Sequence, residues 1–140
     1  TDVCASLARQ LIADAEGAHH DVAIEVRTAA TEADALEVAR AVARNNLVKC
    51  AIFGNDPNWG RILAAVGTTA AAFEASALDV TMNGIPVCRG GGVGADRSLV
   101  DLSGREVRIA IDLHAGSASA TVWTNDLTHD YVHENSAYST

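Results

Sequence analysis

The chain has 140 residues, of which 49% are hydrophobic and 20% are charged, and its formal net charge is −8 at pH 7. The length fits one domain or part of a larger one, and the apolar content is sufficient for a globular core. Nucleic acid and anionic membrane surfaces are disfavoured as partners, because phosphates require clustered cations and the basic residues here are scattered singly. No apolar run approaches the roughly 20 residues of a transmembrane helix.

Hydrophobic periodicity in the first half of the chain predicts alternating helices and strands. In chain order, we predict a helix ending near Gly17, a strand over residues 22–26, a helix capped by Thr31 and ending near Asn45–Asn46, a buried strand over residues 50–53, and a helix over residues 59–66.

The second half of the chain shows strand patterns separated by turns. Asn83-Gly84 is a strong hairpin signal and predicts pairing of residues 78–82 with residues 85–88. A turn at residues 114–116 predicts a second antiparallel pair, residues 107–113 with residues 118–123. Residues 127–138 are compatible with a short helix or an extended tail. Together these elements predict an α+β fold, in which a mixed or antiparallel sheet has helices packed on one face.

Two short segments have compositions typical of functional loops. Residues 54–61 combine turn formers, a carboxylate, a tryptophan and an arginine, although Asn55 or Asp56 capping a helix would also explain them. The glycine-rich residues 90–94 lack the strand-before, helix-after context of a phosphate loop, so we interpret them as a loop end without nucleotide.

Metal and nucleophile patterns are weak throughout the chain. His129 and His133 have the spacing of a two-histidine metal site to which His114 or Glu134 could contribute, but the pattern departs from that of zinc proteases. Thr1 could act as an N-terminal nucleophile, but it begins a predicted helix. The three cysteines, Cys4, Cys50 and Cys88, lack CxxC spacing and are interpreted as reduced, largely buried thiols. No metal or cofactor site is therefore predicted.

Several long motifs in order resemble the ornithine acetyltransferase family, also called glutamate N-acetyltransferases, over essentially the whole chain. The motifs are residues 13–18 (Ala-Asp-Ala-Glu-Gly-Ala), 43–47, 49–61, 123–128 (Trp-Thr-Asn-Asp-Leu-Thr) and 131–138 (Tyr-Val-His-Glu-Asn-Ser-Ala-Tyr). The resemblance implies a self-processing, Ntn-like fold and acetyl transfer from N-acetylornithine to glutamate through an acetyl-threonine intermediate.

The family's nucleophile motif does not occur in residues 1–140. We therefore expect residues 1–140 to be one C-terminal domain of the nucleophile-bearing beta subunit, with the catalytic threonine upstream of Thr1. The resemblance also implies an alpha chain of the same precursor as partner, a hetero-oligomer in the cytoplasm, and acetyl-CoA as a possible co-substrate.

Three substrate-binding residues follow from the resemblance. Glu16 matches the acidic residue that contacts the substrate amine, Asn135 matches a terminal substrate-binding asparagine, and Thr140 matches a hydroxyl residue five places later. A carboxylate with amide and hydroxyl donors would complement the ammonium and carboxylate groups of an amino acid. His19-His20 stands where the family commonly has a hydroxyl residue and a lysine, which leaves the role of a cation there open.

Two other functions remain compatible with the sequence. The chain could be a non-catalytic module for subunit assembly, or part of a related self-processing amidohydrolase that transfers acyl groups to water.

Overall fold

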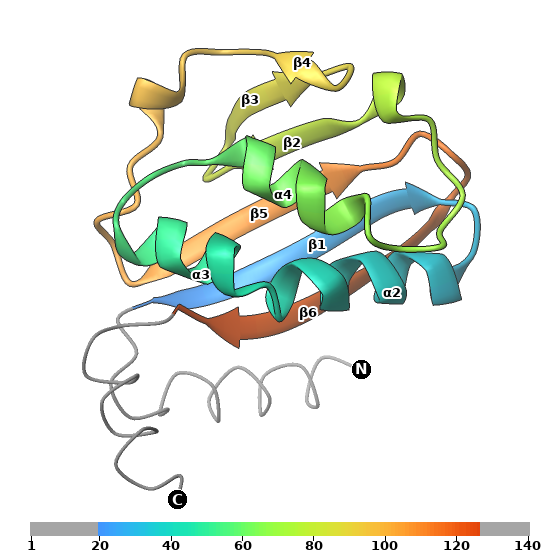
Figure 1. Ribbon diagram of the computed structural model, residues 1–140, viewed down its shortest axis with the longest axis horizontal. Helices are drawn as coiled ribbons and strands as arrows, with labels where there is room; N and C mark the ends of the chain where they lie inside the picture. The colour runs from blue at the N-terminus through green and yellow to red at the C-terminus, as the bar shows by residue number, and fades with distance from the viewer. Residues whose placement is uncertain (1–19, 127–140) are drawn as a thin grey trace, which may run out of the picture.

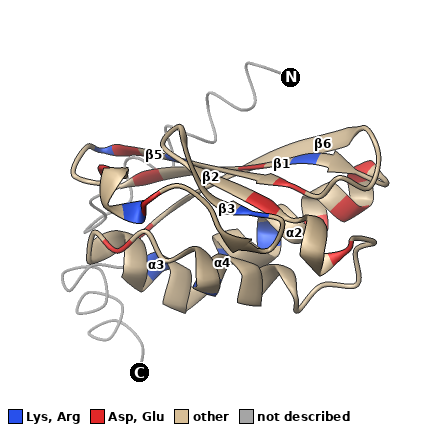
Figure 2. Ribbon diagram, turned by 90° about the horizontal axis from the view of Figure 1, so that it is seen from above, with Lys and Arg blue, Asp and Glu red and all other residues tan. Residues whose placement is uncertain are grey.

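A computed structural model of the chain describes residues 20–126 (Figure 1). Within this range six strands form one mixed sheet in the order β4-β3-β2-β5-β1-β6. The strands are β1 (Asp21–Ala29), β2 (Asp79–Met82), β3 (Ile85–Arg89), β4 (Gly92–Val93), β5 (Glu106–Asp112) and β6 (Ala118–Asn125). The helices are α2 (Glu32–Ala43), α3 (Asn46–Phe53) and α4 (Trp59–Val66), with short 3-10 helices at Ala75–Ala77 and Arg97–Leu99. All three α-helices lie on one side of the sheet (Figure 2), which confirms the predicted fold class.

Strand β1 lies between β5 and β6 and pairs with both. Its Ile24 is opposite Ile109 of the parallel strand β5 and opposite Val122 of the antiparallel strand β6. The predicted hairpin between residues 107–113 and 118–123 is therefore wrong, because β1 separates the two strands. Strand β1 is the longest and most deeply buried strand. Because it has a neighbouring strand on each edge, its buried backbone N–H and C=O groups find hydrogen-bond partners on both sides.

The predicted hairpin around Asn83-Gly84 is confirmed. Strands β2 and β3 pair antiparallel, and the two turn residues have φ angles of 47° and 83°. Tight hairpin turns need positive φ at both central positions, and asparagine and glycine adopt it at low cost.

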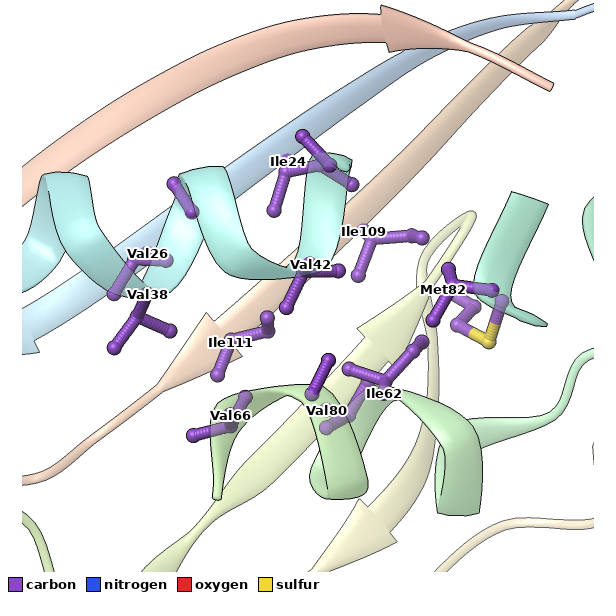
Figure 3. Close-up of a cluster of buried hydrophobic side chains, with 14 of the residues drawn as sticks. Ile24, Val26, Val38, Val42, Ile62, Val66, Val80, Met82, Ile109 and Ile111 are labelled. Carbon is purple, nitrogen blue, oxygen red and sulfur yellow. The ribbon is translucent and has the colours of Figure 1, made fainter. Parts of the chain in front are cut away.

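The core lies between the sheet and the helices (Figure 3). Alternate residues of β1, Val22, Ile24 and Val26, point to this side and are fully buried. They pack with Ile109 and Ile111 of β5 and with residues of α2, α4 and β2. Full burial of one such side chain contributes about 1.5–3 kcal/mol, so this layer supplies most of the driving force for the fold.

Residues 50–53 belong to helix α3, so the predicted buried strand there is wrong. The Asn45 side chain accepts a hydrogen bond from the Val48 N–H at 3.0 Å and caps the helix. Val48, Ala51 and Ile52 form a buried stripe at helical spacing, whereas Cys50 is exposed. The expectation of buried thiols is wrong for Cys50, which is exposed, and is confirmed for Cys88, which is buried. Cys4 lies outside the described residues.

The other two helices begin where the sequence predicts. The Thr31 hydroxyl accepts a hydrogen bond from the Asp34 N–H at 3.0 Å at the start of α2, and α4 runs to Val66 before Gly67. Helix α2 ends at Ala43, because Asn45 already caps α3. None of the helices within residues 20–126 is long and apolar enough to cross a membrane.

Candidate functional site

The three predicted substrate-binding residues, Glu16, Asn135 and Thr140, lie outside the described residues. The same holds for Thr1, His19, His129, His133 and Glu134. The structure does describe the residues at which both substrate-binding segments join the sheet, His20 at the start of β1 and Asp126 at the end of β6.

His20 and Asp126 form a buried pair that brings these two junctions together. The His20 backbone N–H donates to Asp126 Oδ1 at 2.9 Å, and His20 Nδ1 lies 2.6 Å from Asp126 Oδ2. On its other side, His20 Nε2 lies 2.7 Å from the carbonyl oxygen of Leu102. The two side chains are almost inaccessible, with 6% of His20 and none of Asp126 exposed. The pair therefore joins the residue before β1 to the residue after β6.

Lys49, the only lysine of the chain, lies beside this junction. Burial lowers the pKa of its ammonium group, and the charge of Asp126 partly opposes that effect. Lys49, Arg40 and Arg44 line a shallow hollow of about 300 Å³ against Val122 and other residues of β6. This hollow is thus basic in a chain with an overall charge of −8.

Residues 54–61 form the connection between α3 and α4. Asn58 accepts a hydrogen bond from the Arg61 N–H at 3.1 Å and caps α4, while Arg61 Nη1 donates to the Leu47 carbonyl at 2.9 Å. The residue that caps α4 is therefore Asn58. The alternative that Asn55 or Asp56 caps this helix is wrong. The Asn58 cap agrees with the interpretation of this segment as the start of a helix, and the Arg61 side chain connects α4 to α3.

The two segments with compositions typical of functional loops meet in the fold. A groove of about 610 Å³ is lined by Asn58, Trp59 and Gly60 on one side and by residues 93–97 on the other. Arg97 Nη1 lies 3.9 Å from Asp56 Oδ1 across it, and both side chains are largely exposed. The sequence could not show this proximity, since residues 62–89 separate the two segments.

The glycines of residues 90–94 serve chain packing. A Cβ at Gly91, whose φ is 73°, would lie 2.4 Å from the Ala75 carbonyl oxygen, and a Cβ at Gly94 would lie 2.4 Å from that of Pro86. Both positions exclude larger residues because the backbone of another segment passes so close. Close packing of the backbone therefore accounts for glycine at these two positions.

A second histidine–aspartate contact lies at the opposite end of the sheet and was not predicted. His114 Nε2 is 2.7 Å from Asp79 Oδ2, and His114 Nδ1 is 3.4 Å from Asp112 Oδ1. The hydrogen bond from His114, supported by one from the Gly90 N–H, lowers the pKa of Asp79, and the bond to Asp79 raises the pKa of His114. One ligand atom from each of the three residues lies within 4.8 Å of the others, but the group is exposed and already internally paired.

The signal for this cluster is present in the sheet register. Asp79 and Asp112 are direct partners across β2 and β5, and two facing carboxylates favour a cation between them. The register itself could not be derived from the sequence, because β5 was predicted to pair with β6.

The mixed sheet with a layer of helices on one face defines an α+β fold, with a buried polar junction at one end of the sheet. The sequence model of the ArgJ family matches residues 1–140, and the chain belongs to this family.

Two relatives, each named arginine biosynthesis bifunctional protein ArgJ, are about equally similar to the chain. The protein from Thermobifida fusca is 65% identical over 140 residues, which cover all of this chain and 37% of the relative. The protein from Streptomyces avermitilis is 65% identical over 137 residues, which cover 98% of this chain and 36% of the relative. The chain thus spans little more than a third of the length of these relatives.

A solved structure supports the same assignment. The crystal structure of arginine biosynthesis bifunctional protein ArgJ from Bacillus halodurans superposes with a TM-score of 0.89 at 32% identity. The superposition covers 97% of this chain and 66% of that chain. The resemblance inferred from the sequence motifs is confirmed at the level of family and fold.

Proposed function

We propose that this chain is part of an N-acetyltransferase of arginine biosynthesis, which moves an acetyl group from N-acetylornithine to glutamate. The observation that carries the proposal is the match to the ArgJ family over all 140 residues, together with 65% identity to relatives named for arginine biosynthesis. Because the chain covers about a third of those relatives, it supplies one part of the enzyme.

The proposed chemistry is covalent acyl transfer in two steps. A threonine hydroxyl, proposed to lie upstream of Thr1 in the longer polypeptide, attacks the acetyl carbonyl carbon of N-acetylornithine. The amide C–N bond breaks, the amine of ornithine takes up the proton, and an acetyl-threonine ester remains. The amine of glutamate then attacks the ester carbonyl, and the threonine hydroxyl is regenerated with a proton from that amine. Acetyl-CoA could supply the same ester in a second, bifunctional mode.

The contribution of this chain is to complete the substrate pocket. The Glu16 carboxylate is proposed to bind the substrate ammonium group, and the Asn135 amide and Thr140 hydroxyl to bind its carboxylate. In support of this arrangement, the junctions of the two segments, His20 and Asp126, are in direct contact. No metal or organic cofactor has a role in this chemistry.

The proposed partners are the alpha chain of the same precursor and the remainder of the beta chain. Together they would form a hetero-oligomer that acts on small amino acids in the cytoplasm, with neither nucleic acid nor membrane as a partner. These assignments rest on family membership and on the short span of the chain relative to its relatives.

Replacement of Glu16 tests the proposal in the whole enzyme. Loss of a charged hydrogen bond costs about 1.5–3 kcal/mol, so Glu16→Ala should lower kcat/KM for N-acetylornithine by about 10- to 150-fold. Glu25→Ala is the matched control, because Glu25 is a partly exposed carboxylate of β1 that pairs with Arg27. Kinetics of the Glu16 variant that equal those of the Glu25 variant would remove Glu16 from the pocket.

Two further assays separate this function from the alternatives. Removal of residues 135–140 should abolish transfer while the subunits stay assembled, whereas an assembly module would lose its oligomeric state first. Product analysis with and without glutamate distinguishes a transferase, which needs the acceptor for turnover, from an amidohydrolase, which releases acetate without it.

A further inference from the structure

The face of the sheet that points away from the helices has no helical layer in the part of the chain that the structure describes. All three α-helices lie on the other side (Figure 2). Side chains alternate across a strand, so Ala23, Glu25 and Arg27 of β1 point to this face, and so do their cross-strand partners. We call this surface the open face and define it by Ala23, Arg27, Arg108, Ala110, Thr121 and Trp123.

A hollow lies on the open face where a small side chain stands between two large ones. Ala23 is the direct partner of Arg108 on β5 and of Trp123 on β6, so the three residues form one row across the sheet. The hollow measures about 430 Å³, and all three residues line it. It is large enough to hold a side chain of a segment that covers the face.

The open face has the composition of a protein interface. Arginine and tryptophan are enriched in such interfaces, whereas lysine is depleted. The open face contains two arginines and a tryptophan, Arg27, Arg108 and Trp123. The only lysine of the chain, Lys49, belongs to α3 on the other side of the sheet. This composition favours a protein as the occupant of the open face.

The charge of Arg108 specifies the chemistry of that occupant. Arg27 is paired with Glu25, but no acidic side chain among the described residues pairs with the guanidinium group of Arg108. A segment that covered Arg108 without supplying a carboxylate would leave a buried charge unpaired, which is strongly destabilising. An acidic side chain is therefore the best occupant of the hollow.

The length of the relatives indicates where such a segment comes from. This chain matches 37% of the Thermobifida fusca relative, so most of that protein lies outside the matched part. In the solved ArgJ structure, the superposed part is 66% of one chain, so that chain contains further polypeptide. A second copy of the open face is less suitable, because Glu25, the only carboxylate that lines the hollow, is already paired with Arg27.

We propose that the open face is the surface on which the rest of the same enzyme packs, with an acidic side chain of that polypeptide bound in the hollow between Arg108 and Trp123. This inference rests on the proposed function, in which the chain is one part of a larger acetyltransferase. The bound carboxylate pairs with the Arg108 guanidinium, and its aliphatic part packs against the indole of Trp123 and the methyl group of Ala23.

Thiol labelling of the whole enzyme tests whether the open face is covered. Thr121 is exposed in the described part of the chain, so a Thr121→Cys thiol would react fast on an uncovered face. In native enzyme, N-ethylmaleimide should label residue 121 at least about 100-fold more slowly than in urea-unfolded enzyme, as measured by peptide mass spectrometry. The exposed Cys50 on α3 is the reference, and its native and unfolded labelling rates should agree within about 10-fold.

The labelling result can overturn the proposal. Labelling of residue 121 in native enzyme within about 10-fold of its unfolded rate would show that the open face is uncovered. If Thr121→Cys does not fold, hydroxyl-radical footprinting of Trp123 in the unmodified enzyme measures the same protection.

Photo-crosslinking of the whole enzyme identifies the occupant. With p-benzoylphenylalanine in place of Thr121, the crosslinked peptide should come from the part of the enzyme outside residues 1–140. A crosslink to a second copy of this chain, or to residues 1–19 or 127–140, would overturn the proposal.

Reversal of one charge tests the pairing in the hollow. Arg108→Glu should lower the melting temperature of the whole enzyme by about 5 °C or more, because two carboxylates would then face each other. Arg44→Glu is the matched control, since Arg44 is an exposed arginine at the end of α2 on the helical side, and its melting temperature should change by less than about 2 °C. Equal shifts would overturn the pairing. A wild-type enzyme that protects the open face but transfers no acetyl group would instead reject the proposed function.

Discussion

The sheet has a histidine–aspartate contact at each end, and the two differ in their surroundings. His20 and Asp126 are buried and tie three segments together, whereas His114 is 46% exposed and Asp79 is 39% exposed. The contact distances are nearly equal, 2.6 Å and 2.7 Å, so geometry alone does not distinguish them. The two contacts do differ in desolvation. A buried polar group that loses its partner cannot form a hydrogen bond with water in its place. The comparison teaches that identical side-chain pairs can have very different effects on the protein.

The largest expected effect is on the buried pair. Asp126→Ala leaves Nδ1 of His20 and its backbone N–H without their partner, and removing one partner of a buried pair costs about 3–5 kcal/mol. The free energy of unfolding, measured by urea denaturation, checks this value. Asp79→Ala at the exposed end should give a much smaller loss, because water replaces the missing partner. Equal losses at the two ends would abolish the distinction.

The exposed pair of His114 and Asp79 should make the stability of the protein depend on pH. The pKa of His114 is raised, so its contribution is present below the ordinary value of 6.5 and is lost as pH rises through the higher folded value. The pKa of Asp79 is lowered, so its contribution is present above the ordinary value of 3.8 and is lost as pH falls through the lower folded value.

The pair therefore stabilises the protein chiefly between these two ordinary values. His114→Asn should lower the melting temperature at about pH 5 and have little effect at about pH 9. Asparagine is chosen because the φ of residue 114 is 50°, a conformation that asparagine tolerates. A melting-temperature difference that is independent of pH would show that the pair has no electrostatic role.

The smallest effect is expected for a surface pair on the same sheet. Arg27 Nη2 lies 2.6 Å from Glu25 Oε1, but the side chains are 56% and 40% exposed. Such pairs contribute up to about 1 kcal/mol, so Arg27→Met should change the free energy of unfolding by less than this amount. A loss as large as that of Asp126→Ala would show that short distance matters more than burial.

Most elements of the fold could be predicted, because local chemistry specifies them. The Thr31 cap, the Asn83-Gly84 turn and the alternation of β1 each depend on a few neighbouring residues. The error at residues 50–53 arose because four consecutive apolar residues are compatible with a buried strand and with a helix. The cap at Asn45 was the deciding signal, and it was assigned to the end of the preceding helix.

Pairings between distant segments could not be predicted in the same way. Strand β1 separates β5 from β6, and 106 positions separate His20 from Asp126. A sequence contains no local signal for such contacts, since they form only when the core has fixed the order of the strands. Glu16, Asn135 and Thr140 were identified by family motifs, and their roles remain a prediction.

The most direct measurement is a crystal structure of the whole enzyme with ornithine bound. We predict that the Glu16 carboxylate lies within about 3 Å of an ammonium group of the ligand, with Asn135 in contact with the same molecule. The intact contact between His20 and Asp126 should lie at the base of both segments. A ligand bound without contact to Glu16, or with Glu16 and Asn135 on opposite sides of the subunit, would contradict the account.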